Sequence, residues 1–90
     1  MRVVSARQDL TGYRELGWVT AEREQVGDGV QCTQRIQLSP DSPAKVRPTL
    51  LLCWRTSAAR SAYTVAVDFK GKPSVQESVA EINKAWSKLS

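Results

Sequence analysis

The end of the chain, from Pro73 to Leu89, predicts an amphipathic helix. Ser74 followed by Glu77 is the pattern of a capping box, in which each side chain accepts a hydrogen bond from a backbone N–H at the start of a helix. Apolar residues then recur at helical spacing and form one stripe: Val75, Val79, Ile82, Trp86 and Leu89. A helix with one apolar stripe needs a surface to cover. The sequence therefore predicts an α+β fold, with this helix packed on one face of a three- to four-stranded antiparallel meander.

Two strands with strong patterns precede this helix. Thr49–Thr56 is the most hydrophobic segment, and Ser61–Phe69 alternates large apolar residues with small or polar ones. We place the turn between them at Ala58 and Ala59. The pairs that face each other are then Trp54 with Tyr63, Leu52 with Val65, and Leu50 with Val67. All six side chains point to the same face, and this agreement between register and pattern favours the pairing.

The N-terminal segment predicts two short elements. Arg2–Ala6 fits a first strand, and Asp9 or Thr11 could cap a brief helix that runs through Leu16. Gly17 would end that helix in the left-handed conformation. The C-terminal helix covers only one face of the sheet. The other face must therefore be polar, be paired with a partner, or be covered by this N-terminal segment.

Two further strands are predicted in the middle of the chain, over Trp18–Val26 and Val30–Leu38. Gly27-Asp28-Gly29 lies between them and is a strong hairpin signal, because glycine tolerates positive φ. The second strand alternates, although Gln34 interrupts its apolar face. Ser39–Pro48 is predicted as a loop, since its three prolines cannot donate to a central ladder.

The two cysteines decide the expected compartment. If the hairpin between their strands is centred on Ser42 and Pro43, Cys32 lies opposite Cys53, close enough for a disulfide. Such a bridge would stabilise the domain by about 3 kcal/mol in the chain-entropy model. The same register sets polar residues opposite apolar ones, so two reduced, buried cysteines are the alternative. A disulfide would indicate an oxidising setting outside the cytoplasm.

Composition narrows the class of function. Ninety residues make one domain, 1–90, with a net charge of +4 and no histidine. The basic residues are scattered, which disfavours a nucleic-acid binder. Without histidine the chain lacks the commonest general base and metal ligand, and no catalytic constellation is present. We therefore predict a protein that is not an enzyme and that uses no cofactor and no metal. No segment approaches the ~20 apolar residues of a membrane span.

Two candidate binding surfaces carry positive charge. The first is a basic patch at one end of the sheet, for a phosphate, an acidic glycan or a protein partner. It would consist of Trp54, Arg55 and Arg60, joined by Arg35, Arg47 and Lys45. The second is an anion site formed by Lys72 and Ser74 at the start of the helix. The same residues are also explained by the backbone geometry at the start of the helix, without any bound anion.

Two stretches carry a resemblance. Arg47–Ser57 and Tyr63–Asp68, with the helix that follows, look like the ends of small uncharacterised exported or lipid-anchored proteins of actinobacteria. The resemblance covers most of residues 17–89. It implies an extracytoplasmic setting, with any leader lying before Met1.

Two functions follow as expectations. The first is a non-enzymatic extracytoplasmic binding or accessory domain, held by a Cys32–Cys53 bridge and binding a protein or an anionic ligand. The second is a small cytoplasmic protein with reduced cysteines, which binds nucleic acid or an acidic protein through its positive charge. An exposed sheet face would also permit a homodimer with a self-complementary contact.

Overall fold

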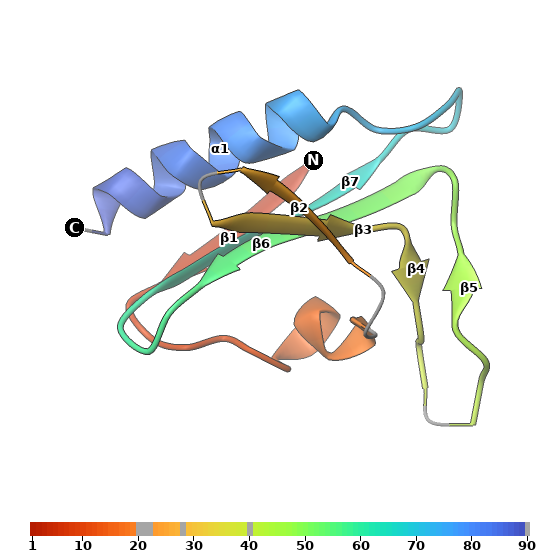
Figure 1. The fold of residues 1–90 in the computed structure, drawn as a ribbon, viewed down its shortest axis with the longest axis horizontal. Coiled ribbons are helices and arrows are strands. Elements are labelled where there is room, and N and C mark those ends of the chain that lie inside the picture. The colour runs from red at the N-terminus through yellow and green to blue at the C-terminus, as the bar shows by residue number, and fades with distance from the viewer. Residues whose placement is uncertain (20–22, 28, 40, 90) are drawn as a thin grey trace.

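The computed structural model describes residues 1–19, 23–27, 29–39 and 41–89. The fold is α+β, as predicted: one C-terminal helix packs against a five-stranded antiparallel sheet, and a separate two-stranded sheet lies beside it (Figure 1). The elements in chain order are β1 (Arg2–Ala6), the 3₁₀ helix η1 (Arg14–Trp18), β2 (Glu24–Gly27), β3 (Val30–Thr33), β4 (Arg35–Ile36), β5 (Lys45–Val46), β6 (Leu50–Thr56), β7 (Ser61–Val67) and α1 (Val75–Lys88).

The larger sheet has the strand order β1-β7-β6-β3-β2. The predicted register of β6 and β7 is confirmed, since Trp54 lies opposite Tyr63 and Leu52 lies opposite Val65. The predicted first strand is also present, but its partner is β7, near the other end of the sequence. This pairing satisfies the outer edge of β7. It makes the sheet five strands wide, where the meander predicted three or four.

The strand predicted over Val30–Leu38 is divided into β3 and β4. The break falls at Gln34, the residue that interrupts the apolar pattern. Thr33 Oγ1 accepts a hydrogen bond from the Arg35 N–H at 3.0 Å, and the Arg47 N–H donates to the Gln34 carbonyl at 2.8 Å. These bonds replace ladder hydrogen bonds and turn the chain out of the main sheet.

The β4–β5 hairpin is the consequence of that break. β5 lies within Ser39–Pro48, which was predicted as a loop throughout, although Pro40 lies outside the described residues. Ile36 is buried and faces Lys45 across the hairpin, whereas Leu38, the last residue of the predicted strand, is 50% exposed. The prediction failed here because a two-residue strand has too little pattern to identify it.

The strand predicted over Trp18–Val26 is also shorter than expected. β2 begins at Glu24, residues 20–22 lie outside the described residues, and Val19 makes an isolated bridge to Ile36. The predicted hairpin turn joins β2 to β3. Gly27 and Gly29 have φ of 116° and 78°, values that favour glycine, while Asp28 lies outside the described residues.

The helix α1 begins and packs as its sequence predicts. Ser74 Oγ accepts a hydrogen bond from the Glu77 N–H at 3.2 Å, which is the expected N-cap. The stripe faces the sheet, where Ile82 and Trp86 are buried. They join the first core cluster with the buried sheet residues Val30, Cys32, Leu51, Cys53, Ala62 and Ala66.

The N-terminal segment covers the other face of the sheet, one of the three alternatives left open by the sequence. Leu10 and Leu16 pack there in a second core cluster with Leu52, Trp54 and Tyr63. The brief helix is present as η1, but Gly17 does not end it, because the helix continues to Trp18. Gly17 is needed instead for a close approach: a Cβ there would lie 3.1 Å from the carbonyl oxygen of Gly12.

Candidate functional site

The disulfide joins β3 to β6 at the predicted position. Cys32 lies opposite Cys53 in the ladder, and their sulfur atoms are bonded at 2.08 Å. The pair is therefore oxidised, and the alternative of two reduced cysteines does not apply. Cys53 is fully buried and Cys32 is 2% exposed, so the bridge is part of the core.

A groove with a volume of about 450 Å³ lies beside this bridge. Its walls come from the residues before and in β2, from β3, from the β4–β5 hairpin and from the segment that enters α1. It is lined by Arg23, Glu24, Cys32, Thr33, Gln34, Arg35, Val46, Leu51, Lys72 and Val75. We call it the cationic groove, because it collects three basic side chains and one carboxylate.

The three basic residues of the cationic groove come from distant parts of the chain. Arg23 precedes β2, Arg35 lies in β4 and Lys72 precedes α1. Within the ranges that the structure describes, neither Arg23 nor Lys72 forms an ion pair. Buried Leu51 and Cys32 lie among them, and an apolar surface strengthens electrostatic attraction. Two guanidinium groups and an ammonium group around such a space suit a phosphate or carboxylate group.

The structure rearranges the predicted anion-binding residues. Lys72, predicted at the helix start, and Arg35, predicted for the basic patch, line the same groove. Ser74 is instead occupied as the N-cap of α1. Arg23 was not predicted. Its place depends on how β2 approaches β4, which no local sequence pattern encodes.

The predicted basic patch does not form as one surface. Trp54 is buried on the face covered by the N-terminal segment, whereas Arg55 lies on the helix face. Adjacent residues of a strand point to opposite faces, so this separation follows from the strand itself. Arg47 precedes the start of β6 while Arg55 lies near its end, which also separates the predicted members along the sheet.

Arg55 and Arg60 instead hold the end of the helix. Their guanidinium carbons lie 4.2 Å and 4.3 Å from the centroid of the Trp86 ring. Arg60 Nη1 also donates a hydrogen bond to the Trp86 carbonyl at 3.1 Å, near the C-terminus of α1. Cation–π contacts stabilise the packing of Trp86 against the two arginines, and a cation near the C-terminus of a helix stabilises that helix. We therefore assign this group a structural role.

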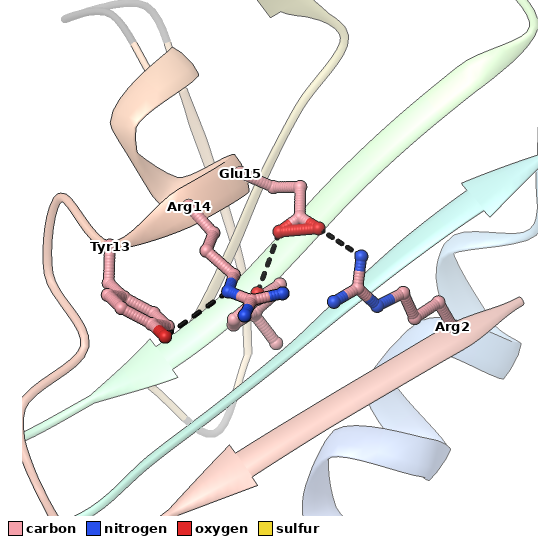
Figure 2. Close-up of polar contacts among 5 residues, drawn as sticks. Arg2, Tyr13, Arg14 and Glu15 are labelled. Atoms are coloured by element: carbon pink, nitrogen blue, oxygen red, sulfur yellow. Dashed lines mark hydrogen bonds and ion pairs between the residues drawn. The ribbon is translucent and has the colours of Figure 1, made fainter.

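A polar network joins the N-terminal segment to the sheet, and no sequence pattern predicts it (Figure 2). Glu15 is only 7% exposed, and its carboxylate accepts hydrogen bonds from the Tyr63 hydroxyl at 2.8 Å and from Arg2. Arg14 lies beside it, with its Nε donating to the Tyr13 hydroxyl at 3.2 Å. Because β1, η1 and β7 each supply a member, the network depends on the whole topology.

The network shifts two pKa values. Burial raises the pKa of Tyr63 to about 12, helped by its hydrogen bond to Glu15 and by the charge of that carboxylate. Burial alone would also raise the Glu15 pKa. The hydrogen bond from Tyr63, a backbone N–H and the charges of Arg2 and Arg14 together outweigh burial and lower it. The carboxylate and the phenol are thus held in complementary states, one ionised and one neutral.

These shifts predict a stability profile with two limbs. Glu15 stabilises the fold fully above its unfolded pKa, and this contribution is lost as pH falls through its lower folded pKa. Tyr63 stabilises the fold fully below about pH 10, and this contribution is lost as pH rises towards its folded pKa of about 12. For Glu15→Gln, the free energy of unfolding measured in urea should fall less steeply with decreasing pH on the acid side than it does for the wild type. An exposed control, Asp41→Asn, should keep the wild-type slope; equal slopes for all three proteins would contradict the prediction.

A second cavity, of about 240 Å³, lies on the opposite face of the sheet. It is lined by Thr11, Gly12, Leu16, Val19, Arg23, Gln31, Trp54 and Thr56. Arg23 is its one charged lining residue, so it offers less to a charged ligand than the cationic groove. Across the described ranges, no group of three potential ligands among His, Cys, Asp and Glu could hold a metal ion. In the same ranges, no helix is long and apolar enough to span a membrane.

Comparisons with known proteins add no further assignment. The chain matches no protein-family model, no curated protein and no solved structure. The resemblance to exported actinobacterial proteins therefore stays a prediction, and the candidate site rests on the geometry of the cationic groove.

Proposed function

We propose that this protein is a non-enzymatic binding domain of an extracytoplasmic compartment, and that the cationic groove binds an anionic group of its ligand or partner. The disulfide supports the compartment, because such bonds persist in oxidising environments. The alternative, a cytoplasmic nucleic-acid binder, draws less support. The disulfide disfavours that alternative, because thiols are kept reduced in the cytoplasm.

The observation that carries the proposal is the convergence of Arg23, Arg35 and Lys72 on one groove. Gathering like charges costs free energy. Glu24 is the one carboxylate in the lining of the groove. An anion bound between them would remove the remaining repulsion, which explains why the site would favour phosphate or carboxylate over a neutral ligand.

A titration with inorganic phosphate, followed by the amide resonances of the oxidised protein at constant ionic strength, tests this proposal. We expect saturable binding with a dissociation constant of about 1 mM, typical of a small ion held by a few charged contacts. The double variant Arg35→Gln/Lys72→Gln should weaken binding at least about tenfold, because it removes two charge-assisted hydrogen bonds.

The matched control is Arg7→Gln/Lys84→Gln, which removes the same charge at two exposed residues outside the groove. It should bind phosphate as the wild type does. If both double variants lose affinity equally, binding reflects net charge alone and the groove is not the site. Absence of saturation in the wild type would also reject the proposal.

A further inference from the structure

One end of the sheet exposes apolar and basic side chains together. The Asp68 N–H donates to the Thr49 carbonyl at 2.9 Å, which sets the loop after β7 beside the start of β6 (Figure 1). Phe69, in that loop, is 90% exposed. Val67, at the end of β7, is 49% exposed, and Val46, which lies in β5 of the smaller sheet and lines the cationic groove, is 56% exposed. Isolated exposed apolar residues are ordinary, but Val67 and Phe69 are two residues apart in the chain, and Val46 lines the same groove as Lys72, which follows Phe69 by three residues.

The Phe69 side chain is held outward by the shape of its loop. The Asp68 carboxylate accepts a hydrogen bond from the Lys70 N–H at 2.9 Å, and the Gly71 N–H donates to the Asp68 carbonyl at 3.3 Å. These bonds make a tight turn with Phe69 at its tip. The ring is therefore projected into solvent by an ordered turn.

Basic residues are frequent in the segments that carry these apolar side chains and in those that line the cationic groove. Six basic residues belong to the segments at this end: Arg23, Arg35, Lys45, Arg47, Lys70 and Lys72. The described carboxylates of the same segments are Glu24, Asp41 and Asp68. Lys72 connects the two features, because it lines the cationic groove three residues after Phe69. The end thus combines a projecting aromatic ring, an excess of positive charge and a groove suited to an anion.

We infer that this end of the sheet docks on an anionic lipid surface. Phe69 enters the boundary between headgroups and acyl chains, Val46 and Val67 follow at its edge, and a lipid phosphate occupies the cationic groove. This inference rests on the proposed function, since it names the source of the anion. Clusters of lysine and arginine attract anionic leaflets, and an aromatic side chain adds apolar burial at the interface.

The exposure of Phe69 favours a lipid surface over a protein partner. A ring that projects almost fully from a protein would need a deep complementary pocket in a partner protein. A fluid bilayer accommodates such a ring without a preformed pocket. Lys70 and Lys72 follow the ring by one and three residues, where they can meet anionic headgroups as the ring enters the interface.

Co-sedimentation with lipid vesicles tests the inference. The oxidised protein should bind vesicles of equal parts phosphatidylglycerol and phosphatidylcholine, and should not bind pure phosphatidylcholine. Phe69→Ala should lower the partition coefficient at least about tenfold, the loss expected when one buried aromatic side chain is removed. Lys70→Gln should lower it about fivefold, the contribution of one basic residue near an anionic surface. Because both residues are exposed, neither variant should change the melting temperature.

The matched aromatic control is Tyr13→Ala, which removes a 47% exposed ring from the N-terminal segment. It should bind vesicles like the wild type. The inference is overturned if Phe69→Ala binds anionic vesicles as tightly as the wild type does. It is also overturned if the wild type does not bind anionic vesicles. If phosphate still saturates the groove in that last case, the proposed function stands and only the lipid inference fails. If phosphate does not bind either, both fail.

Discussion

Replacing both bridged cysteines by alanine is expected to lower the free energy of unfolding by about 3 kcal/mol or more. The bridge closes a loop with a sequence separation of 21, and the chain-entropy model assigns a loop of that size about 3 kcal/mol. Loss of two buried sulfur atoms adds a cavity penalty. Because small domains are marginally stable, this is a large share of the total. Thermal unfolding of Cys32→Ala/Cys53→Ala should show a midpoint more than about 10 °C lower.

The wild type with and without reductant supplies the control for this prediction. Both cysteines are buried, so a reductant acts mainly after unfolding. In urea with reductant, the wild type should unfold at a midpoint close to that of the double variant, and without reductant at a clearly higher concentration. Equal midpoints under the two conditions would mean that no tether holds β3 to β6.

Trp86→Ala is expected to lower the free energy of unfolding by about 3–5 kcal/mol, the usual range for a buried tryptophan. This is at least as large as the expected effect of removing the disulfide. Trp86 is 8% exposed, packs in the first core cluster and is contacted by two guanidinium groups. Its removal leaves a cavity under α1 and takes the cation–π partner from Arg55 and Arg60. Urea unfolding followed by circular dichroism should show a much lower midpoint and an early loss of helical signal.

Trp18→Ala is the matched control, because it deletes the same ring from a half-exposed position in η1. We expect it to lower the free energy of unfolding clearly less than Trp86→Ala does. Trp86→Phe keeps an aromatic face for the two guanidinium groups and should be intermediate. If Trp86→Ala melted within a few degrees of the wild type, or if both alanine variants cost the same, the helix would not depend on this contact as the structure implies.

Features that depend on short-range pattern could be predicted from the sequence. The β6–β7 register follows from two alternating strands around a short turn, and the start of α1 follows from Ser74 and Glu77. Pairing of Cys32 with Cys53 required only one further assumption, the centre of a loop. The predicted pairing is confirmed even though that loop contains β5, since the β4–β5 hairpin projects from the sheet without changing the β3–β6 register.

Features built from distant segments could not be predicted. β1 pairs with β7, and the sequence separation between those strands leaves no local signal. The network of Arg2, Glu15 and Tyr63 exists only because of that pairing. The cationic groove depends on the break at Gln34, which turns Arg35 and the hairpin towards Lys72. Charge alone could not have revealed that these two residues share a site.

The failure of the predicted basic patch has a different origin. The alternation of side chains along β6 already implied that Trp54 and Arg55 point to opposite faces. The structure instead divides the basic residues into two groups: Arg55 and Arg60 contact Trp86 at the end of the helix, while Arg35 and Lys72 line the cationic groove.

A crystal structure of the oxidised protein with phosphate, at a concentration that saturates the titration, tests the central claim most directly. The claim predicts one phosphate in the cationic groove, within hydrogen-bond distance of Arg35 and Lys72 and clear of neighbouring molecules. An unoccupied groove at that concentration, or a phosphate bound instead at Arg55 and Arg60, would contradict it.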